Sequence, residues 1–530
     1  KIEDTSWIKP MKFIGIWWGM HLKTMTWHQG PLHGATTENM KRYIDFAADN
    51  GFGGVLAEGW NTGWEDWGKP DVVAQFSFTT PYSDYDLEYL TNYAHQRGVQ
   101  IIFHHETQGN AASYQHQLDT AFAYMQQHGM HAVKTGYVAP TIQTIDGIQY
   151  NRSQSGVRHY RKVIETAATY QVSIDNHEPV MPTGLQRTYP NLMTQEGIRG
   201  QEWNAWSQDG GSPCEHVTVL PFTRMLAGPA DYTPGVFNFD NPVYPNTRVH
   251  ATLANQLGLF VVLYSPLQMA CDLPENYMLH PEEFEFIRCV PCDWERSIML
   301  DGQIGDYIVM ARQARNTDNW YIGAVTDEQA RSTTITWADF LGKGDYQAII
   351  YQDAAQADWQ TNPYATAIDT LSVHRHSDPL TINSLLSEMV EAGCGYCFME
   401  VSSIGVEQDR VAGLKFKAGI FSNLTHDHLD YHKTFAEYLR CKKLFFDNLP
   451  ADAVAITNVD DRNGMVMTQN TKARVVTYSL RSIADHTCRV IEQSFEGMLL
   501  RIDGTEAWST LIGNHNAYNL LAIHTTAVEL

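Results

Sequence analysis

The chain has 530 residues, a formal net charge of −23 at pH 7, and 43% hydrophobic and 18% charged residues. At about 100 to 200 residues per domain, this length predicts roughly two to four folded domains, and the composition excludes a disordered or collagen-like chain. The negative charge, with no run rich in Lys or Arg, argues against nucleic acid as a partner. No apolar stretch approaches the roughly 18 residues of a membrane-spanning helix.

Short apolar runs alternate with amphipathic helical patterns from the beginning of the chain. The predicted strands are 12–18, 54–58, 99–106, 132–138 and 172–178, and the predicted helices include one capped by Thr37, 86–97, 113–128 and 158–170. Regular βα units with nearly continuous apolar strands are typical of a parallel sheet. Segments around Gly200 and at 217–222 and 259–264 bring the count close to eight, which favours a closed (β/α)8 barrel of the TIM type over an open doubly wound sheet.

The pattern changes after Trp294. Short alternating strands are predicted at 307–312, 320–325, 333–337 and 346–351, as in a small antiparallel β-domain. A second change near His374, which 13 of the 14 tryptophans precede, begins a new α/β pattern. We therefore predict a catalytic barrel over 1–296, a C-terminal β-sandwich domain over 297–373 and an α/β domain over 374–530.

Acidic and imidazole side chains follow several of the predicted barrel strands. They are Glu58, then His104, His105 and Glu106, then His177 and Glu178, and finally Glu196 and Glu202 in the sixth unit. Because the carboxyl ends of barrel strands meet at one mouth, these groups are expected to converge. Paired carboxylates serve acid/base catalysis at an acetal carbon, and clustered oxygens bind Ca²⁺. A single such glutamate is equally well explained as a solvated or ion-paired residue, but the repeated His-Glu pairs favour a site.

Aromatic side chains crowd the same predicted mouth. They are Trp17, Trp18, Trp60, Trp64 and Trp67. Aromatic faces stack on the C–H faces of sugars, but a large barrel core also uses tryptophan. The two explanations have equal weight.

Several longer motifs in this part of the chain carry a family resemblance. They include Trp7-Ile8-Lys9-Pro10, Glu58-Gly59-Trp60-Asn61, His104-His105-Glu106-Thr107, Lys134-Thr135-Gly136-Tyr137 and Leu220-Pro221-Phe222-Thr223-Arg224. Over about residues 5–373 the sequence resembles glycoside hydrolase family 97. The resemblance implies a periplasmic, calcium-assisted α-glucosidase that acts on an α-glucoside such as a malto-oligosaccharide.

The resemblance also assigns roles to individual residues. It implies that Glu202 is the general acid that protonates the leaving oxygen, and that Glu106 and Glu178 act as the base on the attacking water. It implies a calcium site made of Glu178, Glu196 and Glu202, and substrate contacts from His104, His105 and His177. Family members also carry an N-terminal β-sandwich with a further calcium ligand, and this chain is expected to begin after it and to have a truncated C-terminal β-domain.

The residue at the end of the fourth strand distinguishes two mechanisms within this family. Retaining members have a nucleophilic aspartate there, and this chain has Gly136. The resemblance therefore implies inversion, in which the two carboxyl groups stand about 6.5 to 9.5 Å apart and leave room for a water molecule.

Residues from about 377 to 530 carry motifs of a different kind. These are Met399-Glu400-Val401-Ser402-Ser403, Gln408-Asp409-Arg410 and Asn423-Leu424-Thr425-His426-Asp427-His428. They resemble the central domain of the Mur ligase that extends UDP-N-acetylmuramoyl-L-alanyl-D-glutamate, a cytoplasmic, ATP-dependent peptide ligase. The resemblance implies that Ser402, Gln408 and Arg410 bind the UDP-muramoyl substrate, that Glu400 and His428 bind Mg²⁺, and that Lys442 is the carbamylated lysine. From the residues alone, this stretch is equally well explained as a solvated loop followed by a core helix at 434–446.

The ligase-like segment lacks one motif that its chemistry requires. ATP phosphates need a glycine-rich loop ending in Gly-Lys-Thr/Ser, and the sequence contains none. We therefore expect no ligation by this segment alone and interpret the chain as a fusion of two partial genes near His374. An active α-glucosidase, a Mur ligase fragment and a catalytically inactive chain remain the competing hypotheses.

Overall fold

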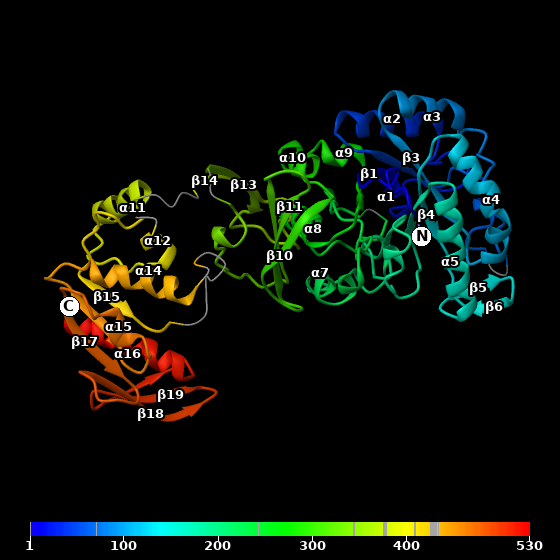
Figure 1. The fold of residues 1–530 in the computed structure, drawn as a ribbon. Helices are drawn as coiled ribbons and strands as arrows, with labels where there is room; N and C mark the ends of the chain where they lie inside the picture. The colour runs from blue at the N-terminus through cyan, green and yellow to red at the C-terminus, as the bar shows by residue number, and fades with distance from the viewer. Residues whose placement is uncertain are drawn as a thin grey trace. The chain divides into compact units, whose positions relative to one another are not determined.

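The structure is a computed structural model, and it describes residues 2–69, 72–241, 243–342, 345–374, 379–407, 410–424, 432 and 434–530. The chain divides into two compact units (Figure 1). The first comprises Lys1–Gly342 and Tyr346–Val373, and the second comprises His374–Leu530 with a short stretch at 343–345. Among the helices described, none has the length and apolar character needed to cross a membrane.

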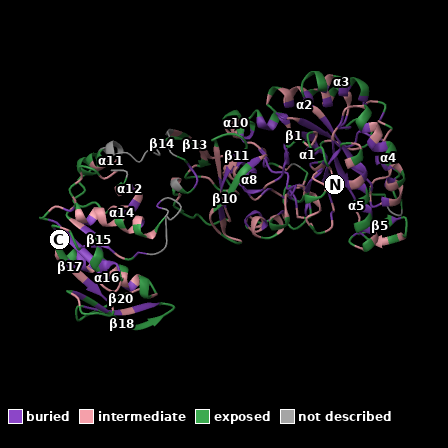
Figure 2. Cartoon of the chain, viewed as in Figure 1, coloured by how far each residue is buried: buried purple, intermediate pink, exposed green. Residues whose placement is uncertain are grey.

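The first unit is built on a nearly closed barrel of seven parallel strands in the order β8-β7-β4-β3-β2-β1-β9. The strands are β1 (Met11–Ile16), β2 (Gly54–Ala57), β3 (Gln100–Glu106), β4 (Ala132–Gly136), β7 (Ser173–Asn176), β8 (Leu192–Gln195) and β9 (Leu267–Ala270). Almost all of their residues are buried (Figure 2), as expected for a parallel sheet that is covered on both faces. The predicted TIM-type barrel is confirmed.

A buried extended segment, residues 230–236, lies between the barrel edges β8 and β9. The N–H of Asp231 donates to the carbonyl of Gln195 on β8 at 3.1 Å, and the N–H of Cys271, directly after β9, donates to the carbonyl of Pro234 at 3.2 Å. The segment thus bridges the two edges without forming a regular strand, and it carries Asp231 to the carboxyl end of β8.

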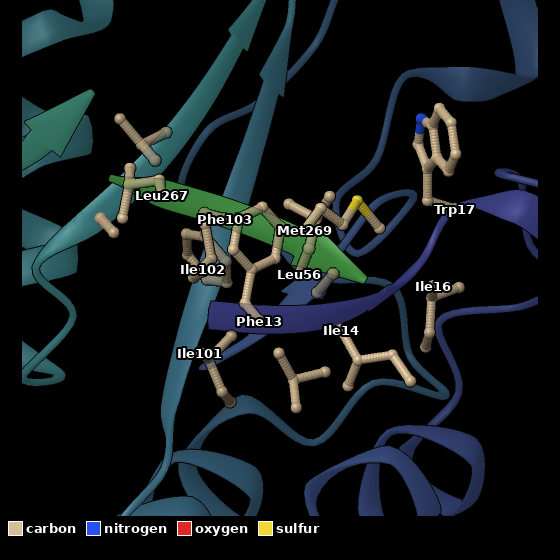
Figure 3. Packing of buried hydrophobic residues seen from close by; sticks show 14 of the residues in the cluster. Phe13, Ile14, Ile16, Trp17, Leu56, Ile101, Ile102, Phe103, Leu267 and Met269 are labelled. Atoms are coloured by element: carbon tan, nitrogen blue, oxygen red, sulfur yellow. The ribbon is translucent and has the colours of Figure 1, made fainter. Parts of the chain in front are cut away.

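Side chains of the barrel strands alternate between its two faces. Figure 3 shows Phe13 and Ile14 on opposite sides of β1, with Ile16 on the side of Ile14 and Trp17 on the side of Phe13. All four side chains are at most 2% exposed. Because a strand has a two-residue period, the same alternation decides which polar residues at its end face the barrel mouth.

The main helices of the first unit follow the predicted βα order (Figure 1). They are α2 (Thr37–Asp49), α3 (Leu87–Gln96), α4 (Ala111–Gln127), α5 (Gln154–Thr169), α8 (Leu253–Val262) and α10 (Pro281–Cys289), with the shorter α1 (Trp18–His21), α6 (Trp203–Trp206), α7 (His216–Val219) and α9 (Pro274–Tyr277). Thr36, one residue before the predicted cap, accepts the N–H of Asn39 and begins α2. A hairpin of β5 (Thr141–Thr144) and β6 (Gly147–Tyr150) precedes α5.

Four predicted strands are absent from the described structure. Residues 217–222 form α7 and a 3-10 turn, residues 259–264 lie mostly in α8, and the region of Gly200 is a turn before α6. Helix α8 is buried on nearly every side, and its second half, Leu257–Val262, has no polar residue that would mark a helical period. Residues 333–336 form no strand and lead into a 3-10 turn at Trp337–Asp339.

Antiparallel sheets follow the barrel in the same unit. Strands β10 (Trp294–Gln303), β11 (Tyr307–Ala314) and β12 (Trp320–Thr326) form one sheet, and β13 (Asp345–Asp353) pairs with β14 (Thr366–His374). The backbones of α8 and β12 approach closely at Gly258 and Gly323, and a side chain added at Gly323 would collide with the carbonyl of Gly258 and with Val261. The β-domain therefore packs directly on the barrel.

The second unit contains a sheet with the order β15-β16-β17-β18-β19-β20. The strands are β15 (Ala418–Phe421), β16 (Val454–Asn458), β17 (Arg474–Ser479), β18 (His486–Ser494), β19 (Gly497–Ile502) and β20 (Thr505–Ser509); the helices are α11 (Pro379–Glu391), α12 (Ser403–Glu407), α14 (Phe435–Asp447), α15 (Gly464–Met467) and α16 (Asn514–Glu529). Strands β15 to β18 are parallel, and β18 to β20 are antiparallel. The unit is α/β, as predicted.

Candidate active site

A cavity of about 750 Å³ opens at the carboxyl ends of the barrel strands. Its lining includes Gly136 and seven of the eight acidic and imidazole candidates, Glu58, His104, Glu106, His177, Glu178, Glu196 and Glu202. Trp17, Trp64 and Trp67 also line it, whereas Trp18 and Trp60 do not. The predicted convergence of acids, imidazoles and some of the tryptophans is therefore what the structure shows.

Glu106 is fixed in one orientation at the end of β3. Its Oε1 accepts the backbone N–H groups of Thr107 at 3.0 Å, Gln108 at 2.6 Å and Val138 at 3.2 Å, and its Oε2 lies 3.8 Å from His104 Nε2. Burial and the neighbouring charge of Glu178 raise the pKa of Glu106 to about 8. The carboxyl group is thus held rigidly, with one oxygen available to the cavity.

Glu106 and Gly136 share the same space. A side chain on Gly136 would collide with Glu106 Oε2 and would lie 3.2 Å from His104 Nε2. Glycine at the end of β4 is therefore a steric requirement of the Glu106 orientation.

Three further glutamates gather around the next two strand ends. Glu178 has a φ of +44°, a left-handed conformation that is strained for a residue with a side chain and common at functional sites. Its Oε2 accepts the N–H of Tyr137 at 2.7 Å, and its own N–H donates to Glu196 Oε2 at 3.3 Å. Burial and the charges of Glu202 and Glu178 raise the pKa of Glu196 well above its ordinary value, against the opposing effect of His177. These neighbouring carboxylates repel one another when all are ionised.

His177 is anchored by Glu196 and by two aspartates that sequence reasoning missed. Its Nε2 lies 2.8 Å from Asp231 and 3.6 Å from Asp175, and its Nδ1 lies 3.6 Å from Glu196. Burial opposes the charged imidazolium, but Glu196 and Asp175 raise the pKa of His177 well above its ordinary value. Asp231 lies in the irregular segment 230–236, where no periodic pattern could have indicated it.

A second buried network supports the other side of the cavity. Glu58 accepts hydrogen bonds from Lys134 Nζ at 3.0 Å and from Trp27 Nε1 at 2.8 Å, and it lies 3.6 Å from His104 Nδ1. Burial alone would raise the pKa of Glu58, but His104 and Lys134 lower it to about 2. Glu58 directly after β2 and Lys134 in β4 lie on the two strands that flank β3, so only the order of the strands in the barrel brings the pair together.

His105 does not reach the cavity, against the prediction. Its ring is fully buried on the opposite face of β3, and its Nδ1 lies 2.9 Å from the hydroxyl of Tyr114 on α4. Because adjacent residues of a strand point to opposite faces, His104 and Glu106 face the barrel mouth and His105 faces the helices.

The predicted ligase residues lie in the second unit, and only some are described. Ser402 Oγ accepts the N–H of Gly405 at 3.0 Å, and the N–H of Arg410 donates to the carbonyl of Gly405 at 2.9 Å. Glu400 is exposed, and the Nζ of Lys442 on α14 lies 5.9 Å from the ring centre of Tyr438. Gln408 and His428 lie outside the described residues, so the proposed magnesium and substrate sites stay predictions.

Comparisons with known proteins match the two parts of the chain to different families. Residues 17–198 match the sequence model of glycoside hydrolase 97, and residues 293–388 match that of the glycosyl-hydrolase 97 C-terminal, oligomerisation domain. A glycoside hydrolase family 97 enzyme from Pseudoalteromonas sp. strain K8, in complex with acarbose, is 50% identical with a TM-score of 0.67, covering 71% of this chain and 58% of that one. The first part of the chain is therefore similar to glycoside hydrolase family 97 in sequence and in fold. The retaining alpha-galactosidase of Bacteroides thetaiotaomicron is 32% identical over 366 residues, 67% of this chain and 50% of that protein.

The C-terminal match is to a biosynthetic ligase. Residues 346–527 match the Mur ligase middle domain. The UDP-N-acetylmuramoyl-L-alanyl-D-glutamate--2,6-diaminopimelate ligase of Phocaeicola vulgatus is 58% identical over 157 residues, 30% of this chain and 32% of that protein. Two parts of the chain therefore match two different families, and the chain spans about half the length of the curated glycosidases and about a third of the ligases that it matches.

Proposed function

We propose that the family 97 part hydrolyses α-glucosidic bonds of malto-oligosaccharide-like substrates with inversion at the anomeric carbon. The observation that carries this proposal is the absence of a carboxylate at Gly136, where the Glu106 carboxylate fills the available space. Without a nucleophile at the end of β4, water is the group that attacks the sugar, and a water molecule requires a base beside it.

Three acids that line the cavity supply both proton transfers of such a reaction. Glu202 donates its proton to the glycosidic oxygen as the bond from that oxygen to the anomeric carbon breaks. Glu106, held by three backbone N–H groups, accepts a proton from the attacking water together with Glu178. The water oxygen forms its bond on the opposite face of the sugar ring, so an α-glucoside gives β-glucose. His104 and His177 line the cavity, where they would contact substrate hydroxyl groups.

The donor set of Glu178, Glu196 and Glu202 fits a calcium ion in its chemistry. All three line the cavity, and Ca²⁺ prefers carboxylate oxygens. Burial and repulsion from the neighbouring carboxylates raise the pKa of Glu196, and a bound cation would counteract both effects. The three groups are not among the described clusters whose ligand atoms all lie within 4.8 Å of one another, so the calcium site is supported by the chemistry of its donors and not by a preformed geometry. When bound, the ion supplies a positive charge that orients these carboxylates and substrate hydroxyl groups.

The relatives support different details of this proposal. The 50% identical enzyme has been solved with acarbose and, as a variant in which one glutamate is replaced by glutamine, with panose, a trisaccharide of glucose. The 32% identical relative is named a retaining alpha-galactosidase. Retention on a galactoside is therefore the alternative, and Gly136 is the feature that argues against it.

Proton NMR of the first-formed product tests the mechanism. The full chain is incubated with p-nitrophenyl α-glucoside, which releases a single glucose, in the presence of Ca²⁺, and the anomeric signals are followed before mutarotation mixes them. Inversion gives β-glucose first, and α-glucose as the first product would overturn the proposal. Parallel assays on the p-nitrophenyl α-glucoside and α-galactoside separate the two substrate classes, and activity on the galactoside alone would contradict the proposed specificity.

A further inference from the structure

A cluster of two histidines and an aspartate lies in the second unit, apart from the residues that the Mur ligase resemblance singles out. His486 begins β18, Asp503 lies in the turn between β19 and β20, and His524 is on α16 (Figure 1). One ligand atom from each residue lies within 4.8 Å of the other two. Three elements separated in the sequence thus bring metal-binding side chains together.

The spacing of the donor atoms is close to that of a coordinated ion. Asp503 Oδ2 lies 2.6 Å from His486 Nδ1 and 3.1 Å from His524 Nε2. Ligands bound at about 2.0 to 2.1 Å in a tetrahedral zinc site stand about 3.3 Å apart. Small side-chain rotations are therefore enough to admit an ion.

Two of the three residues have the outer hydrogen bonds that are typical of metal ligands. The second ring nitrogen of His486, Nε2, lies 3.1 Å from Glu529 Oε1, and Glu529 in turn pairs with Arg474. The other oxygen of Asp503, Oδ1, accepts the N–H of Thr487 at 2.7 Å. A histidine whose far nitrogen donates to a carboxylate is oriented with its near nitrogen toward the ion.

The exposure of the cluster leaves one side open. The side chain of His486 is 11% exposed, whereas those of Asp503 and His524 are 31% and 35% exposed. Water can complete the coordination from the open side. Two imidazoles and one carboxylate suit Zn²⁺ and similar first-row ions, whereas Ca²⁺ and Mg²⁺ prefer oxygen ligands alone.

We propose that His486, Asp503 and His524 form a zinc-binding site that ties α16 to the turn between β19 and β20. The proposal is independent of the hydrolase activity, because all three residues belong to the second unit. The competing explanation is a hydrogen-bonded cluster in which Asp503 accepts from both imidazoles without an ion.

Zinc titration of the chelator-treated full chain tests the site, with isothermal calorimetry as the measurement. We compare the unaltered chain with His524→Gln and Asp503→Asn, and use His515→Gln as the control, because His515 is an exposed imidazole on the same helix and outside the cluster. Both cluster variants should lose one equivalent of bound zinc, and the control should lose none. The comparison between variants is decisive because the described residues include other groups that could bind zinc, such as Glu407, His432 and Cys441.

Equal zinc stoichiometry and affinity in His524→Gln and the unaltered chain would overturn the proposal. Glu529→Gln gives a graded second test, since loss of an outer partner of a ligand should weaken zinc binding about 10- to 100-fold while keeping the stoichiometry. Circular dichroism establishes that each variant is folded. If Asp503→Asn fails to fold, the test rests on His524→Gln alone. This variant is expected to fold because the side chain of His524 is one-third exposed.

Discussion

A carboxylate oxygen of Glu106 occupies the space that a side chain on Gly136 would need. The two positions lie on neighbouring strands and are paired in register, Glu106 of β3 with Gly136 of β4. A carboxylate can therefore be supplied at this place by one strand or the other, but not by both in this arrangement. Whether this place holds a base that activates water or a nucleophile therefore depends on which of these two positions carries the carboxylate.

Gly136→Ala should lower kcat by about 100-fold or more, because a catalytic group displaced by about 1 Å can lose that much activity. Steady-state hydrolysis of the p-nitrophenyl α-glucoside measures the effect. Gly30→Ala is the matched control, since a side chain at Gly30 meets nothing within 4 Å. Unchanged kcat in Gly136→Ala would show that the Glu106 orientation is not required.

Glu202→Gln should slow hydrolysis by a factor that depends on how much protonation the leaving group needs. General acid catalysis contributes roughly 10² to 10⁴-fold, so the loss should be large for maltose and much smaller for α-glucosyl fluoride, whose leaving group needs little protonation. Calcium affinity is measured in parallel, because Glu202 is also a proposed ligand. Equal losses on both substrates would remove Glu202 from the acid role.

The barrel and most of its acidic mouth followed from the sequence because strand period and strand ends are local features. His104-His105-Glu106 ends an apolar run of β3, and the carboxyl ends of parallel strands meet wherever the barrel closes. The face of each residue depends on register, which the sequence did not fix in advance, so His105 was expected at the cavity and lies against Tyr114.

The parts that escaped prediction lack periodicity or depend on distant contacts. Asp231 is carried by an irregular segment that is held between two strand edges by hydrogen bonds to Gln195 and from Cys271. Helix α8 packs against the β-domain, and its second half, Leu257–Val262, has no polar residue, so its sequence resembles a buried strand. In both cases the local conformation depends on contacts with distant parts of the chain, which a local sequence pattern does not contain.

Calcium removal should abolish hydrolysis, and adding Ca²⁺ back should restore it. Glu196→Gln refines this prediction, because Glu196 is a proposed ligand without a proposed role in proton transfer. The variant should need at least about 10-fold more Ca²⁺ for half-maximal activity and should approach the original kcat at saturation. Full activity in the presence of EGTA would contradict a calcium-dependent site.

Glu58→Gln should destabilise the first unit by about 3 to 5 kcal/mol, because it leaves the buried charge of Lys134 without its partner. The structure also predicts the pH dependence. The pKa of Glu58 is lowered from 4.5 to about 2 in the folded chain, so its contribution is present above pH 4.5 and is lost as the pH falls toward 2. Urea unfolding followed by tryptophan fluorescence at several pH values measures both effects.

The matched control for this prediction is Glu88→Gln, on the exposed side of α3. An exposed substitution of this kind should change the free energy of unfolding by less than about 0.5 kcal/mol. The difference between the two variants should be largest near neutral pH and should shrink below pH 4.5, because protonation of Glu58 in the unaltered chain removes the same ion pair that the substitution removes. A difference that stays constant down to pH 2 would mean that Glu58 stabilises the barrel by packing and not by its charge.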